Sequence, residues 1–166
     1  MTADIRIGYL VVPPQLSRTM EIAQRHLGLI ASVHVQEALA DFMADGHFLA
    51  HIRRMRRIYR SRRDHLATAL ARQLDAVLAA EIPPGGMQLI ARFKDGRADR
   101  DAVTRLVAAG VEVRALSSLA LERPHDVGLL LGFAAWRESE IGAAVRIMAN
   151  CLTGKRAARH AERAPN

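Results

Sequence analysis

The order of its predicted elements indicates that this chain folds as an α/β or α+β domain with a helical N-terminal region. Short aliphatic runs alternate with longer stretches in which apolar residues recur at the helical period of 3.6. Glycine and proline pairs punctuate these runs. Half of the 166 residues are hydrophobic, so the chain can bury the core of one compact domain. Only 4% are aromatic, which leaves Ala, Leu, Val and Ile to fill that core.

The first part of the chain predicts one strand and two helices. Residues 5–12 (IRIGYLVV) form a short, β-branched run, which is typical of a buried strand. The pair Pro13-Pro14 ends that run and is suited to begin a helix. Helical periodicity then starts at Leu16. A second helix is predicted over about residues 31–43, and Asp45-Gly46 is its stop signal.

The third predicted helix starts near His47 and runs to about Leu74. Its segment 51–66, HIRRMRRIYRSRRDHL, holds seven arginines among its first fifteen residues. An apolar stripe continues through these arginines at Ile52, Met55, Ile58, Tyr59, Leu66, Leu70 and Leu74. At about 1.5 Å rise per residue the helix is roughly 40 Å long, which is enough to bridge two lobes.

The remainder predicts three strands, two helices and a tail. A turn at residues 83–86 (PPGG) precedes them. The strands are apolar runs, predicted at residues 87–93, 111–116 and 127–134. The helices are predicted at residues 99–109, where Gly110 is the stop, and 138–152. Residues 153–166 are charged and alanine-rich, and we expect them to be disordered.

The net charge of +7 is concentrated in two places. Residues 51–65 carry seven arginines and Asp64, and the tail contributes four basic residues against one glutamate. Clustered arginine suggests binding to nucleic acid. The alternative is a solvated or inter-lobe face on which arginine stems cover apolar surface. We favour the latter, because no aromatic array or helix-turn-helix accompanies the arginines.

Other candidate sites in the sequence are weak. His47 and His51 are four residues apart, but no third ligand completes a metal site, so a polar helix face is the better interpretation. Cys151 is the only cysteine and lies on an apolar helix, which indicates a structural thiol and fits a reducing compartment. The apolar run at residues 7–14 is too short to span a bilayer, and we expect a cytoplasmic protein with no membrane contact.

Four motifs in order resemble one family. The segment at residues 51–66 resembles the pattern H-x-R-R-M-R-x-x-Y-x-x-R-R-x-x-L of the MocR subfamily of GntR transcriptional regulators. Residues 5–14 resemble the L-R-x-G-Y-x-x-x-P strand of these proteins, residues 85–93 resemble their glycine-led small-domain strand, and residues 128–134 (GLLLGFA) resemble their closing strand. Such proteins join a winged-helix DNA reader to a fold-type I aminotransferase-like domain that uses pyridoxal phosphate.

The resemblance implies a domain organisation. Residues 1–14 would be a remnant strand of the large, cofactor-binding lobe, and residues 15–76 would be inter-lobe helices. Residues 77–152 would form the small C-terminal α/β lobe, followed by the basic tail at residues 153–166. The implied fold is therefore the C-terminal small domain of a fold-type I aminotransferase with long inter-lobe helices.

The resemblance also implies roles for single residues. Arg6 would contact the cofactor phosphate, and no catalytic or metal-binding residue is carried over to this chain. The Schiff-base lysine would precede Arg6 by seven or eight residues and so fall before Met1, while the only lysines here are Lys94 and Lys155. Aminotransferases place a carboxylate-binding arginine where this chain has Leu130, and Ser117 would lie near the site.

We therefore expect a C-terminal fragment of a MocR-type regulator, without the Schiff-base lysine and the DNA reader, that is inactive alone as an aminotransferase. Pyridoxal 5'-phosphate is the cofactor of the full-length family and would not bind covalently here. The alternatives are a dimerisation or effector module and a nucleic-acid-binding helix. The partners expected are a second copy or a full-length homologue, and direct DNA binding is not expected without the winged-helix domain.

Overall fold

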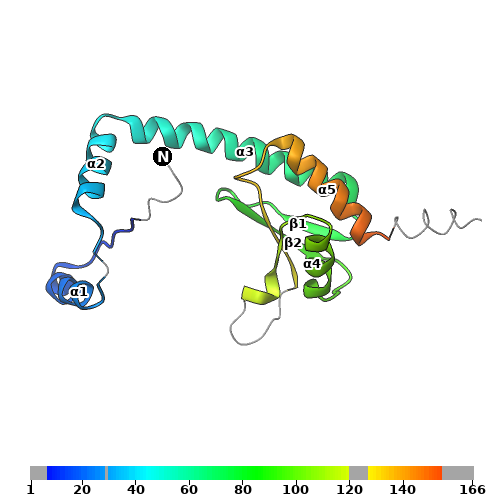
Figure 1. Ribbon diagram of the computed structural model, residues 1–166, viewed down its shortest axis with the longest axis horizontal. Coiled ribbons are helices and arrows are strands. Elements are labelled where there is room, and N and C mark those ends of the chain that lie inside the picture. Colours follow the sequence, from blue (N-terminus) through cyan, green and yellow to red (C-terminus); the bar gives the residue numbers. More distant parts are fainter. Residues whose placement is uncertain (1–6, 29, 120–126, 155–166) are drawn as a thin grey trace, which may run out of the picture. The chain divides into compact units, whose positions relative to one another are not determined.

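The structure is a computed structural model that describes residues 7–28, 30–119 and 127–154. The chain divides between Ile52 and Arg53 into two compact units, each described below by itself. Unit 1 contains the helices α1 (Pro14–His26) and α2 (Val33–Ala44) and the first turns of α3 (His47–Leu74). Unit 2 contains the rest of α3, all the strands and the remaining helices (Figure 1). In the part of the chain that the structure describes, no helix is long and apolar enough to cross a membrane.

The three N-terminal helices confirm the sequence prediction closely. Pro14 occupies the first turn of α1, where its missing N–H costs no hydrogen bond. Gly46 has a φ of +78°, a left-handed conformation that suits glycine and separates α2 from α3. Neither α1 nor α2 has a buried residue, so their apolar stripes contribute nothing to a core in this chain.

The strand predicted at residues 5–12 is wrong for the residues that can be described. Residues 7–13 form neither strand nor helix, and Tyr9, Leu10 and Val11 are each at least 80% exposed. A strand is stabilised by pairing with a neighbour, and no described strand pairs with this segment. The apolar sequence of this segment is therefore suited to a strand, but no described strand pairs with it to form a sheet.

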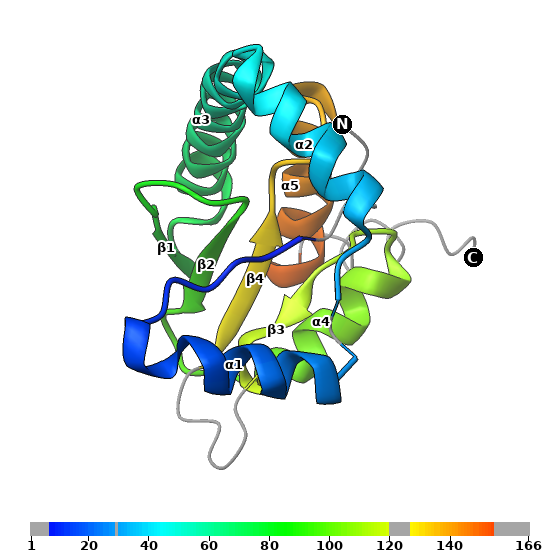
Figure 2. The ribbon, with the colours of Figure 1, turned by 90° about the vertical axis from the view of Figure 1, so that its left-hand side faces the viewer.

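Unit 2 is built on a four-stranded antiparallel sheet with the order β1-β2-β4-β3 (Figure 2). The strands are β1 (Leu78–Glu81), β2 (Gln88–Phe93), β3 (Arg114–Ala115) and β4 (Gly128–Gly132). Strand β1 was not predicted, although the apolar run before the PPGG turn indicates a hairpin. The strand predicted at residues 111–116 is longer than β3, because the chain turns at Leu116 into the 3-10 helix η1 (Leu116–Leu119).

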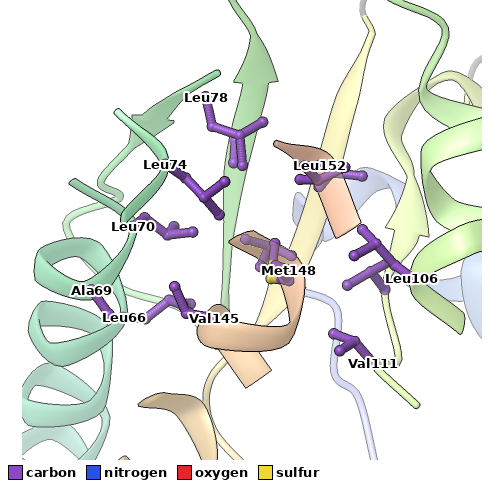
Figure 3. Close-up of a cluster of buried hydrophobic side chains, with 14 of the residues drawn as sticks. Leu66, Ala69, Leu70, Leu74, Leu78, Leu106, Val111, Val145, Met148 and Leu152 are labelled. Atoms are coloured by element: carbon purple, nitrogen blue, oxygen red, sulfur yellow. The ribbon is translucent and has the colours of Figure 1, made fainter. Parts of the chain in front are cut away.

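One face of the sheet carries the hydrophobic core. Leu89, Ala91 and Phe93 alternate along β2 and are buried on that face, as are Leu129 and Leu131 of β4. The helices α4 (Asp99–Ala108) and α5 (Glu138–Leu152) cover this face together with the second half of α3. Figure 3 shows Leu66, Leu70 and Leu74 of α3 lying close to Val145 and Met148 of α5.

Compact unit 2 begins within the arginine-rich helix at Arg53, before residue 77, where the resemblance implies that the small lobe begins. The physical reason is that the second half of α3 is part of the core. Leu70 and Leu74 of α3 are 2% and 1% exposed, and both belong to the cluster formed by the sheet. Helix α3 is therefore a packed helix of unit 2 over its second half.

Candidate functional site

The face of the sheet opposite the helices carries a row of four residues, one from each strand. Glu81 pairs with Ile90, Ile90 with Leu130, and Leu130 with Arg114. Because Leu129 and Leu131 point into the core, Leu130 between them points to the opposite face. We call these four residues the open-face row.

Arg114 is the functional candidate of this row that sequence reasoning missed. It is exposed, and its guanidinium has no hydrogen-bond or ion-pair partner among the described residues. Directly paired residues of antiparallel strands have Cβ atoms about 5 Å apart, so Arg114 places a positive charge beside Leu130. The position of Arg114 beside Leu130 follows from the register of β3 with β4, which cannot be read from a single sequence.

A buried carboxylate fixes the segments behind this row. Asp99 opens α4, is 1% exposed and accepts three hydrogen bonds (Oδ1 from the Ser117 hydroxyl at 2.6 Å, Oδ2 from the Ser117 N–H at 2.9 Å and from the Gly128 N–H at 3.1 Å). It thereby ties η1 and the first residue of β4 to the start of α4. Ser117 is occupied in this contact and 6% exposed, so the structure gives it a packing role.

The ionisation of Asp99 follows from these contacts. Burial by itself would raise the pKa of the carboxyl, because the charged form loses hydration. The hydrogen bonds from Ser117 and Gly128 favour the charged form and together outweigh burial, so the pKa of Asp99 lies below its ordinary value of 3.8. Asp99 is thus a charged structural group at neutral pH.

The arginines of α3 have unequal roles. Arg62 donates to the carbonyl oxygen of Ala134, which follows β4. Arg63 donates to the carbonyl oxygen of Pro83 in the β1–β2 loop at 2.9 Å and also pairs with Asp64 at 2.7 Å. Ser61 adds a hydrogen bond of 2.5 Å to Glu138 at the start of α5. These contacts give part of the arginine-rich segment the structural role that the sequence analysis favoured.

The remaining predicted residues form no catalytic group. Arg6, the predicted cofactor-binding residue, and Lys155 lie outside the described residues. The ring of His47 lies 5.8 Å from that of Phe42. Cys151 is half-buried against the core. Within residues 7–28, 30–119 and 127–154, no three His, Cys, Asp or Glu side chains are grouped to hold a metal ion.

Lys94 is the only lysine in the described part of the chain, and its position does not suit covalent attachment of pyridoxal phosphate. It follows β2 in an exposed turn, and its Nζ lies 3.2 Å from a carboxylate oxygen of Asp75. A Schiff-base lysine acts as a nucleophile from a desolvated setting, whereas the Lys94 side chain is exposed and paired with a carboxylate. The described residues, which do not include Lys155, therefore offer no lysine suited to a covalently held cofactor.

Comparison with known proteins adds the family context. The model of the family "Aminotransferase class I and II" matches residues 2–143. The probable rhizopine catabolism regulatory protein MocR of Rhizobium meliloti is 36% identical over 131 residues, which are 79% of this chain and 27% of that protein. The pyridoxine biosynthesis transcriptional regulator PdxR of Corynebacterium glutamicum is 29% identical over 154 residues, 89% of this chain and 33% of that protein. The chain thus spans about a third or less of these two relatives.

Solved structures of aminotransferases share the fold. The α-aminoadipate aminotransferase LysN of Thermus thermophilus gives a TM-score of 0.79 at 21% identity, covering 89% of this chain and 38% of that enzyme. The multiple substrate aminotransferase of Thermococcus profundus gives a TM-score of 0.78 at 25% identity, covering 87% of this chain and 36% of that enzyme.

Proposed function

Because the chain belongs to the class I and II aminotransferase family, we propose that residues 53–154 form the small lobe of an aminotransferase-like domain in a MocR-type transcriptional regulator. The predicted fold class, a small α+β lobe of a fold-type I aminotransferase with long adjoining helices, is confirmed by the solved aminotransferases that match it. The relation to MocR and PdxR supports a regulatory context. The chain covers only 27% of MocR and 33% of PdxR, which supports the proposal that it corresponds to one part of such a regulator.

In this proposal the open-face row is the surface turned toward a ligand. Leu130 occupies the position that resemblance assigns to a carboxylate-binding arginine in aminotransferases. Arg114 across from it supplies a guanidinium, the group best suited to bind a carboxylate in a bidentate manner. The lobe would thus sense or help enclose an amino-acid-like ligand without performing the chemistry itself.

The observation that carries the inactive assignment is the setting of Lys94, an exposed ammonium paired with Asp75. Pyridoxal phosphate supplies an electron sink for amino-acid chemistry when a lysine holds it. We infer that a lysine for this purpose comes from another part of the protein or from a homologous partner. The chain by itself is then expected to lack transaminase activity.

Reduction with borohydride in the presence of pyridoxal phosphate tests this assignment. We expect no stable absorbance of a lysine-bound cofactor with the full chain, and no single modified lysine after reduction and peptide mass spectrometry. The matched variants are Lys94→Gln and Lys155→Gln. A stable band that one of these substitutions abolishes would contradict the proposal, because it would identify a functional cofactor lysine in this chain.

A further inference from the structure

A pocket of about 450 Å³ lies between α3 and the loop that joins β1 to β2. Its lining includes four side chains of α3 and two backbone positions of the loop, namely Arg56, Tyr59, Arg60, Arg63, Gly85 and Gly86. All these residues belong to unit 2, and Arg6 is not among them. The functional residues discussed so far do not use this pocket.

The positive charge of the pocket is concentrated, and only one of its three arginines is paired with a carboxylate. Arg56, Arg60 and Arg63 are spaced by four and three residues, so they project from one side of the helix. No acidic side chain is among the described residues that line the pocket. Arg63 is paired with Asp64, whereas Arg56 and Arg60 have no hydrogen-bond or ion-pair partner among the described residues.

The loop side of the pocket offers bare backbone. Gly85 and Gly86 are exposed, have no Cβ atom, and their N–H groups bond to no residue within the described ranges. Gly86 has a φ of +90°, which glycine adopts without strain. The hydrogen bond from Arg63 to the Pro83 carbonyl ties this loop to the helix, so the two sides are held together before any ligand arrives.

We propose that this pocket binds the phosphate group of a small phosphorylated molecule. Guanidinium groups match the geometry and charge of phosphate, and exposed backbone N–H groups add neutral donors to its oxygens. Arg53, Arg54 and Arg57 on the same helix do not line the pocket, which favours a compact ligand over a polyanion lying along the helix. The half-buried Tyr59 offers a hydroxyl and a ring to the organic part of the ligand.

The test is a titration of the full chain with inorganic phosphate and with phenyl phosphate, followed by NMR of the Gly85 and Gly86 amides. We expect saturable shifts of these two amides. The double variant R56Q/R60Q should weaken binding by about tenfold or more, because it removes two charge-assisted contacts. The matched control R53Q/R57Q removes the same charge at the same spacing outside the pocket and should change affinity less than about twofold.

Three results would overturn the proposal. One is the absence of saturable shifts, and another is equal weakening by the two double variants, which would indicate nonspecific attraction. The third concerns a short DNA duplex. If it binds more tightly than phenyl phosphate, with a steep salt dependence, and both double variants weaken this binding equally, the surface is a nucleic-acid surface. The single variants R56Q and R60Q, checked by thermal melting, repeat the comparison if the double variant fails to fold.

Discussion

Asp99 connects three segments of unit 2 through one buried carboxylate. Its carboxylate accepts hydrogen bonds from Ser117 and Gly128, which are 18 and 29 residues further along the chain. Removing it would leave two backbone N–H groups without their acceptor in a buried place. An unsatisfied buried donor is more costly than the loss of an average hydrogen bond.

We expect Asp99→Ala to lower the free energy of unfolding by about 3 kcal/mol and Ser117→Ala by about 1 kcal/mol at pH 7. The control Asp101→Ala, on the exposed side of the same helix turn, should cost about 0.5 kcal/mol. Urea unfolding measures all three. The folded-state pKa of Asp99 is depressed, so its contribution is present above the ordinary pKa of 3.8 and is lost as pH falls through the lower folded value.

The difference between the wild type and Asp99→Ala should therefore be constant from about pH 7 to pH 5 and shrink below about pH 4. A difference that stays constant down to pH 3, or grows there, would show that the charged carboxylate is not what stabilises this contact.

At the scale of elements, the close approach of β2 to β4 restricts which residue can occupy position 128, the first residue of β4. A Cβ atom added to Gly128 would lie 2.8 Å from the carbonyl oxygen of Ala91 and 3.2 Å from the Cα of Arg92. Both are backbone atoms of the neighbouring strand, which cannot rotate away. Gly132, at the other end of β4, has nothing within 4 Å of the same added atom.

Gly128→Ala should consequently lower the free energy of unfolding by about 1–3 kcal/mol through displacement of the strands. Gly132→Ala should leave it unchanged or raise it by about 0.5 kcal/mol, because alanine restricts the unfolded chain. Thermal melting of the two variants side by side makes the comparison. Equal effects of the two substitutions would show that the close approach at Ala91 is not rigid.

The helices were predictable from the sequence because their signals are local. Pro14, Gly46 and Gly110 mark helix ends through their own conformational preferences, and the apolar period marks the interiors. The strands were less predictable, because a strand depends on a partner elsewhere in the chain. Residues 7–12 lack that partner, and β1 is only four residues long, with two alanines that favour no sheet.

The candidate site, like the strands, was predictable only in part from the sequence. The motif GLLLGFA located Leu130, but its three consecutive leucines do not show which one faces away from the core. That assignment follows from the burial of Leu129 and Leu131. Arg114 became a candidate only through its register opposite Leu130. The arginine pocket likewise requires the loop at residues 84–86, which is distant in sequence from α3.

At the scale of the whole molecule, the two units differ in how much they bury. Unit 2 holds the entire cluster of buried hydrophobic residues, whereas α1 and α2 bury none of their residues. Leu16, Met20 and Leu27 of the α1 region are 48%, 43% and 69% exposed. An amphipathic helix with an uncovered apolar stripe is stabilised by contact with another surface. We therefore propose that unit 1 is the part of the chain that contacts the expected partner, a second copy or a full-length homologue.

Hydrogen–deuterium exchange of the chain without a partner tests this difference. We expect peptides from α1 and α2 to exchange within the shortest labelling times, because local opening there exposes no core. Peptides from β2, β4 and α5 should be protected. Adding a full-length homologue should slow exchange in α1 and α2 selectively. Strong protection of α1 and α2 in a monomer, established by light scattering, would refute the assignment.

The continuity of α3 has a practical consequence for dividing the chain. The boundary between the units falls at Ile52 and Arg53, inside a helix that runs from His47 to Leu74. A truncation at Arg53 would create a new helix start whose first N–H groups lack acceptors and whose terminal ammonium repels the helix dipole. A truncation that begins at Gly46 would retain the natural helix end. A fragment made for separate study should therefore start at Gly46, although the compact unit itself starts at Arg53.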